Sequence, residues 1–207
     1  MARYTGPKFR LCRREGINLF GIDKYNPKKR ISLPGQHGAN RVRLSEYGKL
    51  LRNKQVLKRI FQMNEKQFAK LVTETSKAFA KNNWLNHDKV LVQFLMRRLD
   101  NVILQSGFAR TIMQARQMVV HGHFLLNGHK HNVPSYFVNA GDVITIKESL
   151  KSSELYSGDN SQKSPLWLSS NKANFSVTVT DLPHTEERDV AELPADVLKV
   201  IEYYARA

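Results

Sequence analysis

The chain has 207 residues, of which 33 are Lys or Arg and 18 are Asp or Glu, and its formal charge of +15 predicts an anionic partner. This length allows one or two domains with real hydrophobic cores. The single cysteine, Cys12, excludes an internal disulfide and favours a reducing compartment. No apolar run approaches the ~18 residues of a membrane span, and the N-terminus lacks the apolar core of a signal peptide.

The positive charge is concentrated at the start of the chain. Residues 1–60 hold sixteen Lys or Arg and three Asp or Glu, whereas the remaining 147 residues hold 17 and 15. Residues 1–44 show no sustained period, and they interleave their cations with four aromatic residues, Tyr4, Phe9, Phe20 and Tyr25. Cations neutralise phosphates and aromatic rings stack on bases, so this arm is predicted to bind RNA. A disordered solubilising tail is the alternative, but the run Pro34-Gly-Gln-His-Gly38 indicates a defined conformation.

A helix is predicted from Ser45 to about Gln62. Ser45 is a typical N-cap, and apolar residues recur at helical spacing after it. The rest of the helix carries Glu46 as its only acid and five cations, Lys49, Arg52, Lys54, Lys58 and Arg59. A merely solvated face would pair Glu with Lys four residues apart, so we prefer an RNA-facing surface to a solvated one.

Two more helices are expected before the middle of the chain. Asn64 with Gln67 begins one of them, which packs into the core and ends at Asn82-Asn83. The other begins at Asp88 and is expected to continue without a break into the segment that follows Met96. A domain boundary would then fall inside or beside a helix near Met96.

Residues 97–146 are predicted to form two short helices and a small sheet. Thr111 is a candidate N-cap, and Gln114 three residues later completes a capping box. Asn127-Gly128 lies between two short apolar runs and predicts a hairpin, because both central residues of such a turn need positive φ. A strand follows at 143–146. Two helices against a sheet, lined with cations, form a compact nucleic-acid platform.

The last quarter of the chain is predicted to be mostly irregular. Residues 151–174 read as a loop with one short strand at 166–168, and residues 175–180 alternate strictly, as a half-buried strand does. Pro194 is expected at the first position of a final helix, whose apolar stripe needs a partner.

Several motifs occur in a fixed order along the chain. In residues 97–146 they are Arg98-Leu99-Asp100-Asn101, Ala115-Arg116-Gln117, His121-Gly122-His123 and Leu126-Asn127-Gly128. This series resembles the RNA-binding module named after small-subunit ribosomal protein S-four, which also occurs in some pseudouridine synthases, a tyrosine tRNA synthetase and a heat-shock RNA binder. Signatures outside the module resemble the ribosomal family itself: Met1-Ala2-Arg3-Tyr4, Arg13-Arg14-Glu15-Gly16, Pro34-Gly-Gln-His-Gly38 and Leu44-Ser45 with Tyr47-Gly48. The resemblance covers residues 1 to about 150 and resumes at the C-terminal helix.

The resemblance implies an α+β fold in three parts. These are a basic N-terminal RNA-binding arm at 1–44, a helical domain at 45–96 that the C-terminal helix 194–206 completes, and an RNA-binding module at 97–185 in which two helices lie against a short antiparallel sheet. It also implies a non-enzymatic protein of the cytoplasmic small ribosomal subunit, which binds the 5′ domain of 16S rRNA early in assembly. Further implications are a place beside proteins S-three and S-five where mRNA enters, support of translational accuracy, and no cofactor, membrane contact or homo-oligomer.

The charge map and the resemblance together predict the RNA contacts. Besides the five cations of the helix that starts at Ser45, the predicted residues are Arg3, Lys8, Arg10, Arg13, Arg14, His37, Arg41, Arg43, Arg97, Arg98, Arg110, Arg116, His121 and Lys130. The resemblance assigns Arg41 and Arg43 to mRNA, and Asn40 stands where a relative has Arg. A free stress-response RNA binder remains a rival function.

Two features of the module suggest chemistry and are weighed against simpler roles. His121, His123, His129 and His131 have spacings that suit a metal, but no carboxylate or cysteine joins them, so polar groups facing RNA are preferred. Relatives with a zinc knot have four cysteines in the arm, and Cys12 alone predicts no zinc here. Arg98-Leu99-Asp100 resembles the catalytic triplet of pseudouridine synthases. Its place in an apolar-periodic helix favours Asp100 as the structural partner of a nearby Arg.

Overall fold

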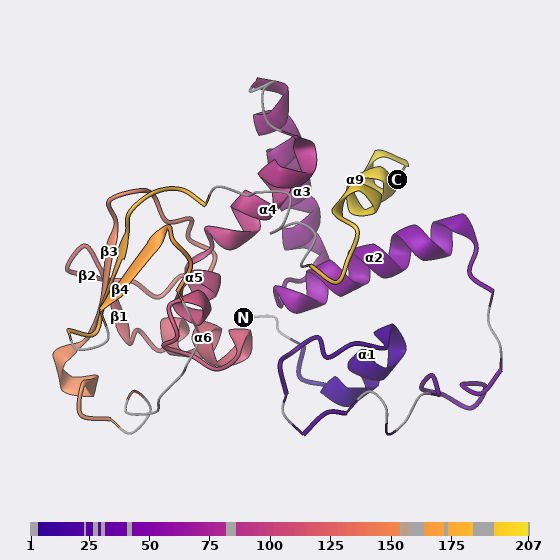
Figure 1. The fold of residues 1–207 in the computed structure, drawn as a ribbon, viewed down its shortest axis with the longest axis horizontal. Helices are drawn as coiled ribbons and strands as arrows, with labels where there is room; N and C mark the ends of the chain where they lie inside the picture. Colours follow the sequence, from indigo (N-terminus) through magenta and orange to yellow (C-terminus); the bar gives the residue numbers. More distant parts are fainter. Residues whose placement is uncertain are drawn as a thin grey trace. The chain divides into compact units, whose positions relative to one another are not determined.

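The computed structural model describes residues 4–22, 24–26, 29, 32–40, 43–81, 86–153, 156, 164–171, 174–183 and 193–206. The chain divides into two compact units, one made of residues 1–92 and 185–207 and the other of residues 93–184 (Figure 1). In the described part of the chain, no helix is long and apolar enough to cross a membrane.

The first unit, unit 1, is helical. Its elements are α1 (Lys8–Glu15), α2 (Glu46–Ile60), α3 (Glu65–Lys81), α9 (Val197–Arg206) and most of α4 (His87–Met96). α9 packs along α2 and also contacts α3 (Figure 1). The amphipathic stripe of the last helix therefore has its partner inside the same unit, where Val197 and Val200 are buried.

Side-chain caps start the helices of unit 1. Ser45 accepts a hydrogen bond from the Gly48 N–H, and Asn64 accepts one from the Gln67 N–H, as expected from the sequence. The expected end of α3 at Asn82-Asn83 lies outside the described residues. The start predicted at Pro194 is wrong: α9 begins at Val197, and Asp196 caps it by accepting from the Lys199 N–H. Aspartate satisfies a free N–H, which proline cannot do.

The arm is more ordered than its lack of period indicated. Residues 8–15 form α1, which is capped at its C-terminal end by Gly16 with φ 74°. Cys12, a residue of this helix, is buried. Farther along, the Leu33 N–H donates to the Gly38 carbonyl, which closes the turn. A Cβ at position 38 would lie 1.8 Å from the Leu33 oxygen, so only glycine fits there. The defined conformation predicted for residues 34–38 is confirmed.

The second unit, unit 2, is a sheet with two helices packed on it. The helices are α5 (Leu99–Gln105) and α6 (Ile112–Val120); the strands are β1 (Phe124–Leu126), β2 (His129–Lys130), β3 (Val143–Ile146), β4 (Leu168–Asn171) and β5 (Ser176–Val179), and a 3-10 turn, η2 (Glu148–Leu150), follows β3. The strand order is β2-β1-β3-β5-β4, and every neighbouring pair is antiparallel. Both helices lie beside the sheet in Figure 1.

The core of unit 2 follows from period-2 alternation in the strands. In β3, Ile144 and Ile146 are almost fully buried, whereas Val143 between the turn and Ile144 is exposed. These buried positions join strand residues such as Phe124 and Val177 to residues of α5 and α6 in one apolar cluster. The pattern buries one face of the sheet against both helices.

The turns predicted for unit 2 are largely confirmed. Asn127 has φ 50° and Gly128 has φ 83°, which are the two positive values that the hairpin requires. Thr111 accepts from the Gln114 N–H, as in a capping box. The reciprocal bond differs, because the Gln114 side chain accepts from the Arg110 N–H rather than from the N-cap residue.

The expected continuous helix across residues 96–99 is wrong. α4 ends at Met96, Arg98 is extended at φ −64° and ψ 136°, and α5 starts at Leu99. Arg98 pairs with Phe137 in an isolated β-bridge, and the Leu99 N–H donates to the Tyr136 carbonyl at 2.8 Å. Backbone pairing with the 134–138 segment thus replaces the helical hydrogen bonds that periodicity alone predicted.

Candidate nucleic-acid interface

Two arginines of unit 2 are buried around one aspartate. The Asp100 carboxylate has no exposed area, and Arg98 and Arg116 are 2% and 8% exposed. Arg98 donates to it at 3.1 and 2.8 Å, and Arg116 donates at 3.3 Å. Burial lowers the pKa of Arg116, and Asp100 opposes that shift. The structural role predicted for Asp100 is confirmed, and these two arginines support the fold from inside.

Arg97 lies at the junction before this cluster and is half-buried. Its Nε donates to the Val138 carbonyl at 3.0 Å, and Nη2 donates to Asn139 at 2.8 Å. Burial lowers the pKa of Arg97, while the charge of Asp142 acts in the opposite direction. Arg97 therefore holds the 138–142 loop while part of its guanidinium stays accessible.

An exposed cationic edge lies at the C-terminal end of α6. His121 and Lys130 are both exposed. Gly122 follows His121, and the Lys130 side chain lies against it. The aliphatic part of Lys130 passes so close to Gly122 that a Cβ there would lie 2.8 Å from Lys130 Cε. Gly122, at φ 69°, thus lets a lysine of the hairpin lie against the end of the helix. Arg110 is exposed before the first turn of the same helix.

Two other histidines of this region, His123 and His131, contact tyrosines. His123 Nδ1 lies 2.9 Å from the Tyr156 hydroxyl, and the rings of His131 and Tyr136 are 4.7 Å apart. Burial, and then the charges of His121 and Lys147, lower the pKa of His123, which favours its neutral form. Within the described ranges, no three His, Cys, Asp or Glu residues are grouped to hold a metal ion.

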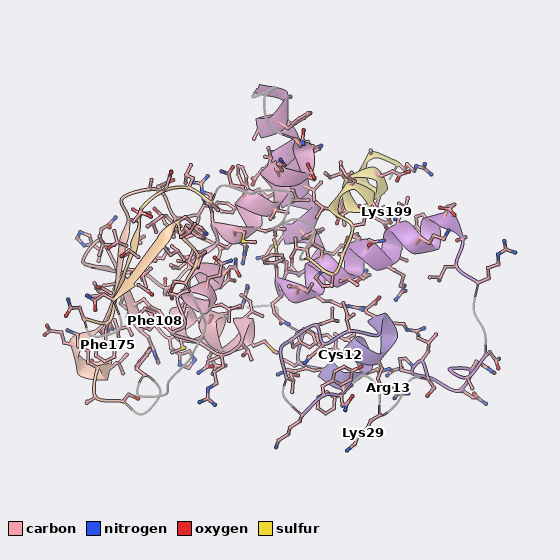
Figure 2. All side chains as sticks on the ribbon, viewed as in Figure 1. Cys12, Arg13, Lys29, Phe108, Phe175 and Lys199 are labelled. Atoms are coloured by element: carbon pink, nitrogen blue, oxygen red, sulfur yellow. The ribbon has the colours of Figure 1, made fainter. Side chains whose placement is uncertain are left out.

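In unit 1, exposed cations lie on the arm, and others lie on α2, α3 and α9. Lys8, Arg10 and Arg14 of α1 are exposed and have no carboxylate partner among the described residues. Arg13 differs, because its Nη2 donates to the Ser32 carbonyl at 2.9 Å and so fastens α1 to the following loop. Lys29 extends outward from the arm (Figure 2). His37 and Arg43 are exposed, whereas Arg3 and Arg41 lie outside the described residues.

Arg52 and Arg59 of α2 share a partner from the arm. The Glu15 side chain is 3% exposed; it accepts from Arg52 at 3.1 Å and also from Arg59. A carboxylate buried in this way needs both guanidinium groups, since it has lost its water. Glu15, the last residue of α1, therefore fixes the arm against α2.

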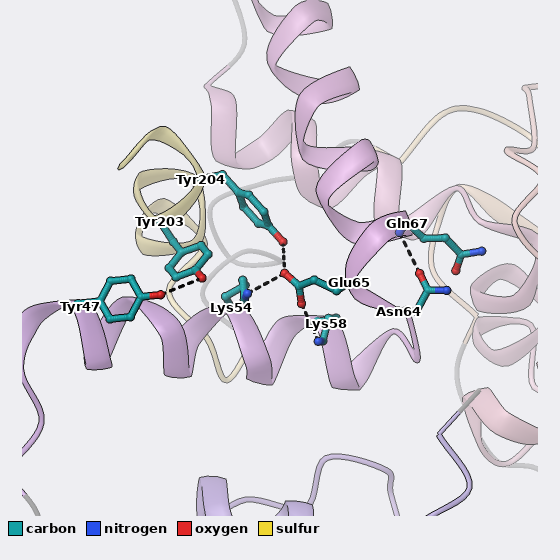
Figure 3. Close-up of polar contacts among 8 residues, drawn as sticks. All are labelled: Tyr47, Lys54, Lys58, Asn64, Glu65, Gln67, Tyr203 and Tyr204. Carbon is teal, nitrogen blue, oxygen red and sulfur yellow. Dashed lines mark hydrogen bonds and ion pairs between the residues drawn. The ribbon is translucent and has the colours of Figure 1, made fainter. Parts of the chain in front are cut away.

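Lys54 and Lys58 of α2 share Glu65, the first residue of α3 (Figure 3). The lysine nitrogens lie 2.6 and 2.7 Å from its carboxylate, and the Tyr204 hydroxyl of α9 donates to it at 2.9 Å. Burial acts to raise the pKa of Glu65, but these three hydrogen bonds outweigh burial and lower it to about 2. Lys54 is 4% exposed and lies 4.3 Å from the Tyr203 ring centre.

The premise for an RNA-facing α2 is therefore wrong. That expectation counted only acids within the helix, whereas Glu15 and Glu65 come from neighbouring elements and pair with four of its cations. Lys49 pairs with Glu46 at 2.6 Å on the surface. RNA contact by these five residues stays a prediction, now without this support. Little in the sequence indicated that Glu15 pairs with α2, except that it is one of only three acids in the first sixty residues.

Comparison with known proteins identifies the family. Residues 3–96 match the ribosomal protein S4/S9 N-terminal domain, and residues 97–144 match the S4 domain. The chain is 42% identical over 216 residues to the small ribosomal subunit proteins uS4 of Thermotoga maritima and Thermoanaerobacter pseudethanolicus, with 100% of each chain covered. The uS4 of Petrotoga mobilis is 40% identical over 218 residues, again with 100% of each chain covered.

The chain belongs to the uS4 family. The two matched uS4 segments meet between residues 96 and 97, which is where α4 ends and the extended link to α5 begins. The resemblance seen in the sequence motifs is thus confirmed along the whole chain. The fold expected from it, helices with a small α/β module, is also confirmed.

Proposed function

We propose that this chain is a non-enzymatic constituent of the small ribosomal subunit that binds 16S rRNA through exposed cations of both units. One observation carries the proposal: the cations fall into two groups. Buried ones hold the fold, whereas the arm and the edge formed by α6 and the hairpin present exposed ones, as do Lys66, Lys70 and Lys77 of α3. The membership in the uS4 family supports the choice of rRNA as the anion.

The direct contacts in this proposal are the exposed members of the predicted set: Lys8, Arg10, Arg14, His37, Arg43, Arg110, His121 and Lys130. Arg98, Arg116 and Lys54 are given a positioning role, because a guanidinium or ammonium group with less than a tenth of its surface exposed cannot neutralise an external phosphate. Arg13 and Arg97 combine both roles. Arg3 and Arg41 complete the proposed set from outside the described residues.

The proposed mechanism is phosphate neutralisation with selection by shape. Each lysine or arginine that meets a phosphate releases counterions, so binding is strong and falls with salt. Helical RNA hides its base edges in a deep groove, and rigid spacing of cations then selects a fold of RNA rather than a sequence. The Glu15 and Glu65 ion pairs supply that rigidity by fixing α1, α2, α3 and α9 together.

An enzymatic role is not proposed. Asp100 is the residue that the pseudouridine synthase resemblance offered, and its carboxylate is fully enclosed by Arg98 and Arg116. A catalytic carboxylate must touch its substrate, and this one cannot do so without unfolding the surrounding helices.

The proposal extends to the finer features of the family resemblance. These are early binding to the 5′ domain of 16S rRNA in subunit assembly, contact with proteins S-three and S-five, a place where mRNA enters, and support of translational accuracy in the cytoplasm. Family membership is their support. Asn40 is exposed at a position where a relative has Arg, so mRNA unwinding is left out of the proposal.

Salt-dependent binding tests the main proposal. A transcript of the 5′ domain of a bacterial 16S rRNA is titrated with wild type and with the triple variant Lys8→Gln, Arg10→Gln, Arg14→Gln, from about 50 to 200 mM salt. We expect weaker binding and a slope of log affinity against log salt that is smaller by about 0.7–0.9 for each lost contact. The control removes three exposed charges from α3, with Lys66→Gln, Lys70→Gln and Lys77→Gln. Equal losses in both variants would show that net charge, and not the arm, binds RNA.

A further inference from the structure

A partly open pocket of about 380 Å³ lies in unit 1 between the arm and the turn that joins α2 to α3. Its floor is apolar and made by Leu11, Phe20 and Met63, and the last two of these are 4% and 7% exposed. Its volume falls in the range of small-molecule sites, and an apolar floor with a few polar groups is typical of them. The proposed function as stated so far, phosphate contact by surface cations, leaves this pocket unused.

Two of the carboxamides that line the pocket have few partners in the protein, whereas a third, Asn64, caps α3. Gln55 and Gln62 line the pocket, and both are partly buried. The Gln55 side chain has no hydrogen-bond partner among the described residues. Within the described part of the chain, the Gln62 carboxamide donates only to the Arg59 carbonyl at 3.4 Å, near the limit of a hydrogen bond. Each carboxamide offers a donor and an acceptor, which is the pattern that reads the edge of a base.

The backbone at Gln62 gives no reason for a glutamine there. Its φ is 52°, a left-handed conformation that glycine adopts freely and that a residue with a side chain rarely adopts. The chain nevertheless holds a long carboxamide at the pocket wall. A binding role for the side chain would account for this choice.

The surroundings of the pocket are aromatic and positively charged. Tyr4 is 45% exposed at the pocket wall, and aromatic side chains are the surfaces on which unstacked bases stack. Lys58 and Arg59 line the pocket too, each already paired with a carboxylate, and each keeps further N–H donors. Glu65 is also at the wall, with its charge offset by Lys54 and Lys58. An uncharged flat group attached to an anionic backbone matches these features.

We propose that this pocket receives a single unstacked nucleobase of the rRNA, an inference that rests on the proposed function. The base lies on the apolar floor, its edge exchanges hydrogen bonds with Gln55 and Gln62, and its phosphate lies toward Lys58 and Arg59. Unit 1 then reads one nucleotide by its base in addition to neutralising phosphates. Because helical RNA hides its base edges, such a contact is confined to a loop, bulge or junction.

Two variants test whether the glutamines of the pocket bind RNA or only stabilise the fold. Gln62→Gly removes the carboxamide and suits the left-handed backbone, and Gln55→Leu removes a carboxamide at similar size. Gln67→Leu is the matched control, since Gln67 is an exposed glutamine of α3 outside the pocket. Binding to the 5′-domain transcript is measured over a salt series, together with thermal melting and with chemical probing of the Watson–Crick edges of unpaired nucleotides.

We expect each pocket variant to bind about three- to tenfold more weakly, as for the loss of one or two hydrogen bonds. The slope of log affinity against log salt should be unchanged. The melting temperature of Gln62→Gly should be equal to or above that of wild type. One nucleotide should be protected by wild type and exposed with both variants. If wild type binds without steep salt dependence, the proposed function itself fails. The pocket proposal alone would be overturned by wild-type affinity in both variants, by a reduced salt slope, or by the absence of any nucleotide with altered protection. A neighbouring protein's side chain would then be the occupant to test.

Discussion

Replacing Asp100 by Asn should destabilise unit 2 strongly. The substitution keeps the shape of the side chain and removes its charge. Asp100 accepts hydrogen bonds from Arg98, Arg116 and the Asn101 N–H, all inside the protein. In the variant, two arginines that are 2% and 8% exposed would lose the carboxylate that they share.

The expected loss is large because the partners cannot reach water. Removing one member of a buried ion pair costs about 3–5 kcal/mol, most of it from the charge that is left unpaired. Unit 2 spans residues 93–184, and for a domain of this size 1 kcal/mol shifts the melting temperature by about 4–8 °C. The melting temperature of unit 2 should therefore fall by at least about 12 °C. Adding Arg116→Met to Asp100→Asn should recover part of the loss, because it removes one of the two opposing charges.

Trp167 fluorescence provides the assay, since this residue is 9% exposed in the core of unit 2. A Trp84→Phe background removes the only other tryptophan, so that the signal reports unit 2 alone. Glu148→Gln is the control, because Glu148 is 94% exposed and its pair with Lys151 at 3.9 Å should contribute little. If Asp100→Asn and Glu148→Gln cost the same, the carboxylate is not what keeps the two arginines buried.

Three further predictions follow from other contacts. The folded pKa of Glu65 is about 2 against an ordinary value of 4.5, so the stability that it contributes is complete above pH 4.5 and is lost as the pH falls toward 2; melting curves of wild type and Glu65→Gln should converge over that range, and a constant difference would contradict it. Gly122→Ala should weaken rRNA binding about two- to fivefold by displacing Lys130, the order expected for one hydrogen-bonded contact, whereas Gly128→Ala, with positive φ and open space, should lose similar stability and keep its affinity. Glu15→Gln should speed proteolysis within the arm by releasing Arg52 and Arg59, and Glu46→Gln, an exposed pair with Lys49, should not.

Local chemistry made much of the fold predictable. The starts of three helices could be predicted at Ser45, Asn64 and Thr111, because these side chains accept hydrogen bonds from N–H groups within three residues. Asn127-Gly128 predicts the hairpin, because few other residue pairs adopt two consecutive positive φ values. These signals need nothing from distant parts of the chain, and for that reason they can be read from the sequence.

The interactions that sequence reasoning missed are those between distant segments. Arg98 leaves the helix because residues 136 and 137 offer backbone partners about forty positions later. Glu15 and Glu65 neutralise α2 from 37 and 7 positions away from the nearest of their partners. A count of charges within one helix cannot include them, and it therefore treated structural cations as candidate RNA contacts. Exposure in the folded chain separates the two classes.

Crosslinking tests the division between exposed and structural cations most directly. The protein is irradiated in complex with intact small-subunit rRNA, and the adducts are mapped on the peptide chain. Adducts should concentrate on Lys8, Arg10 and Arg14 of α1 and on Lys130 of the hairpin, and they should be absent from Arg98 and Arg116 themselves. Adducts confined to the exposed face of α3, with none on the arm or the hairpin, would contradict the account.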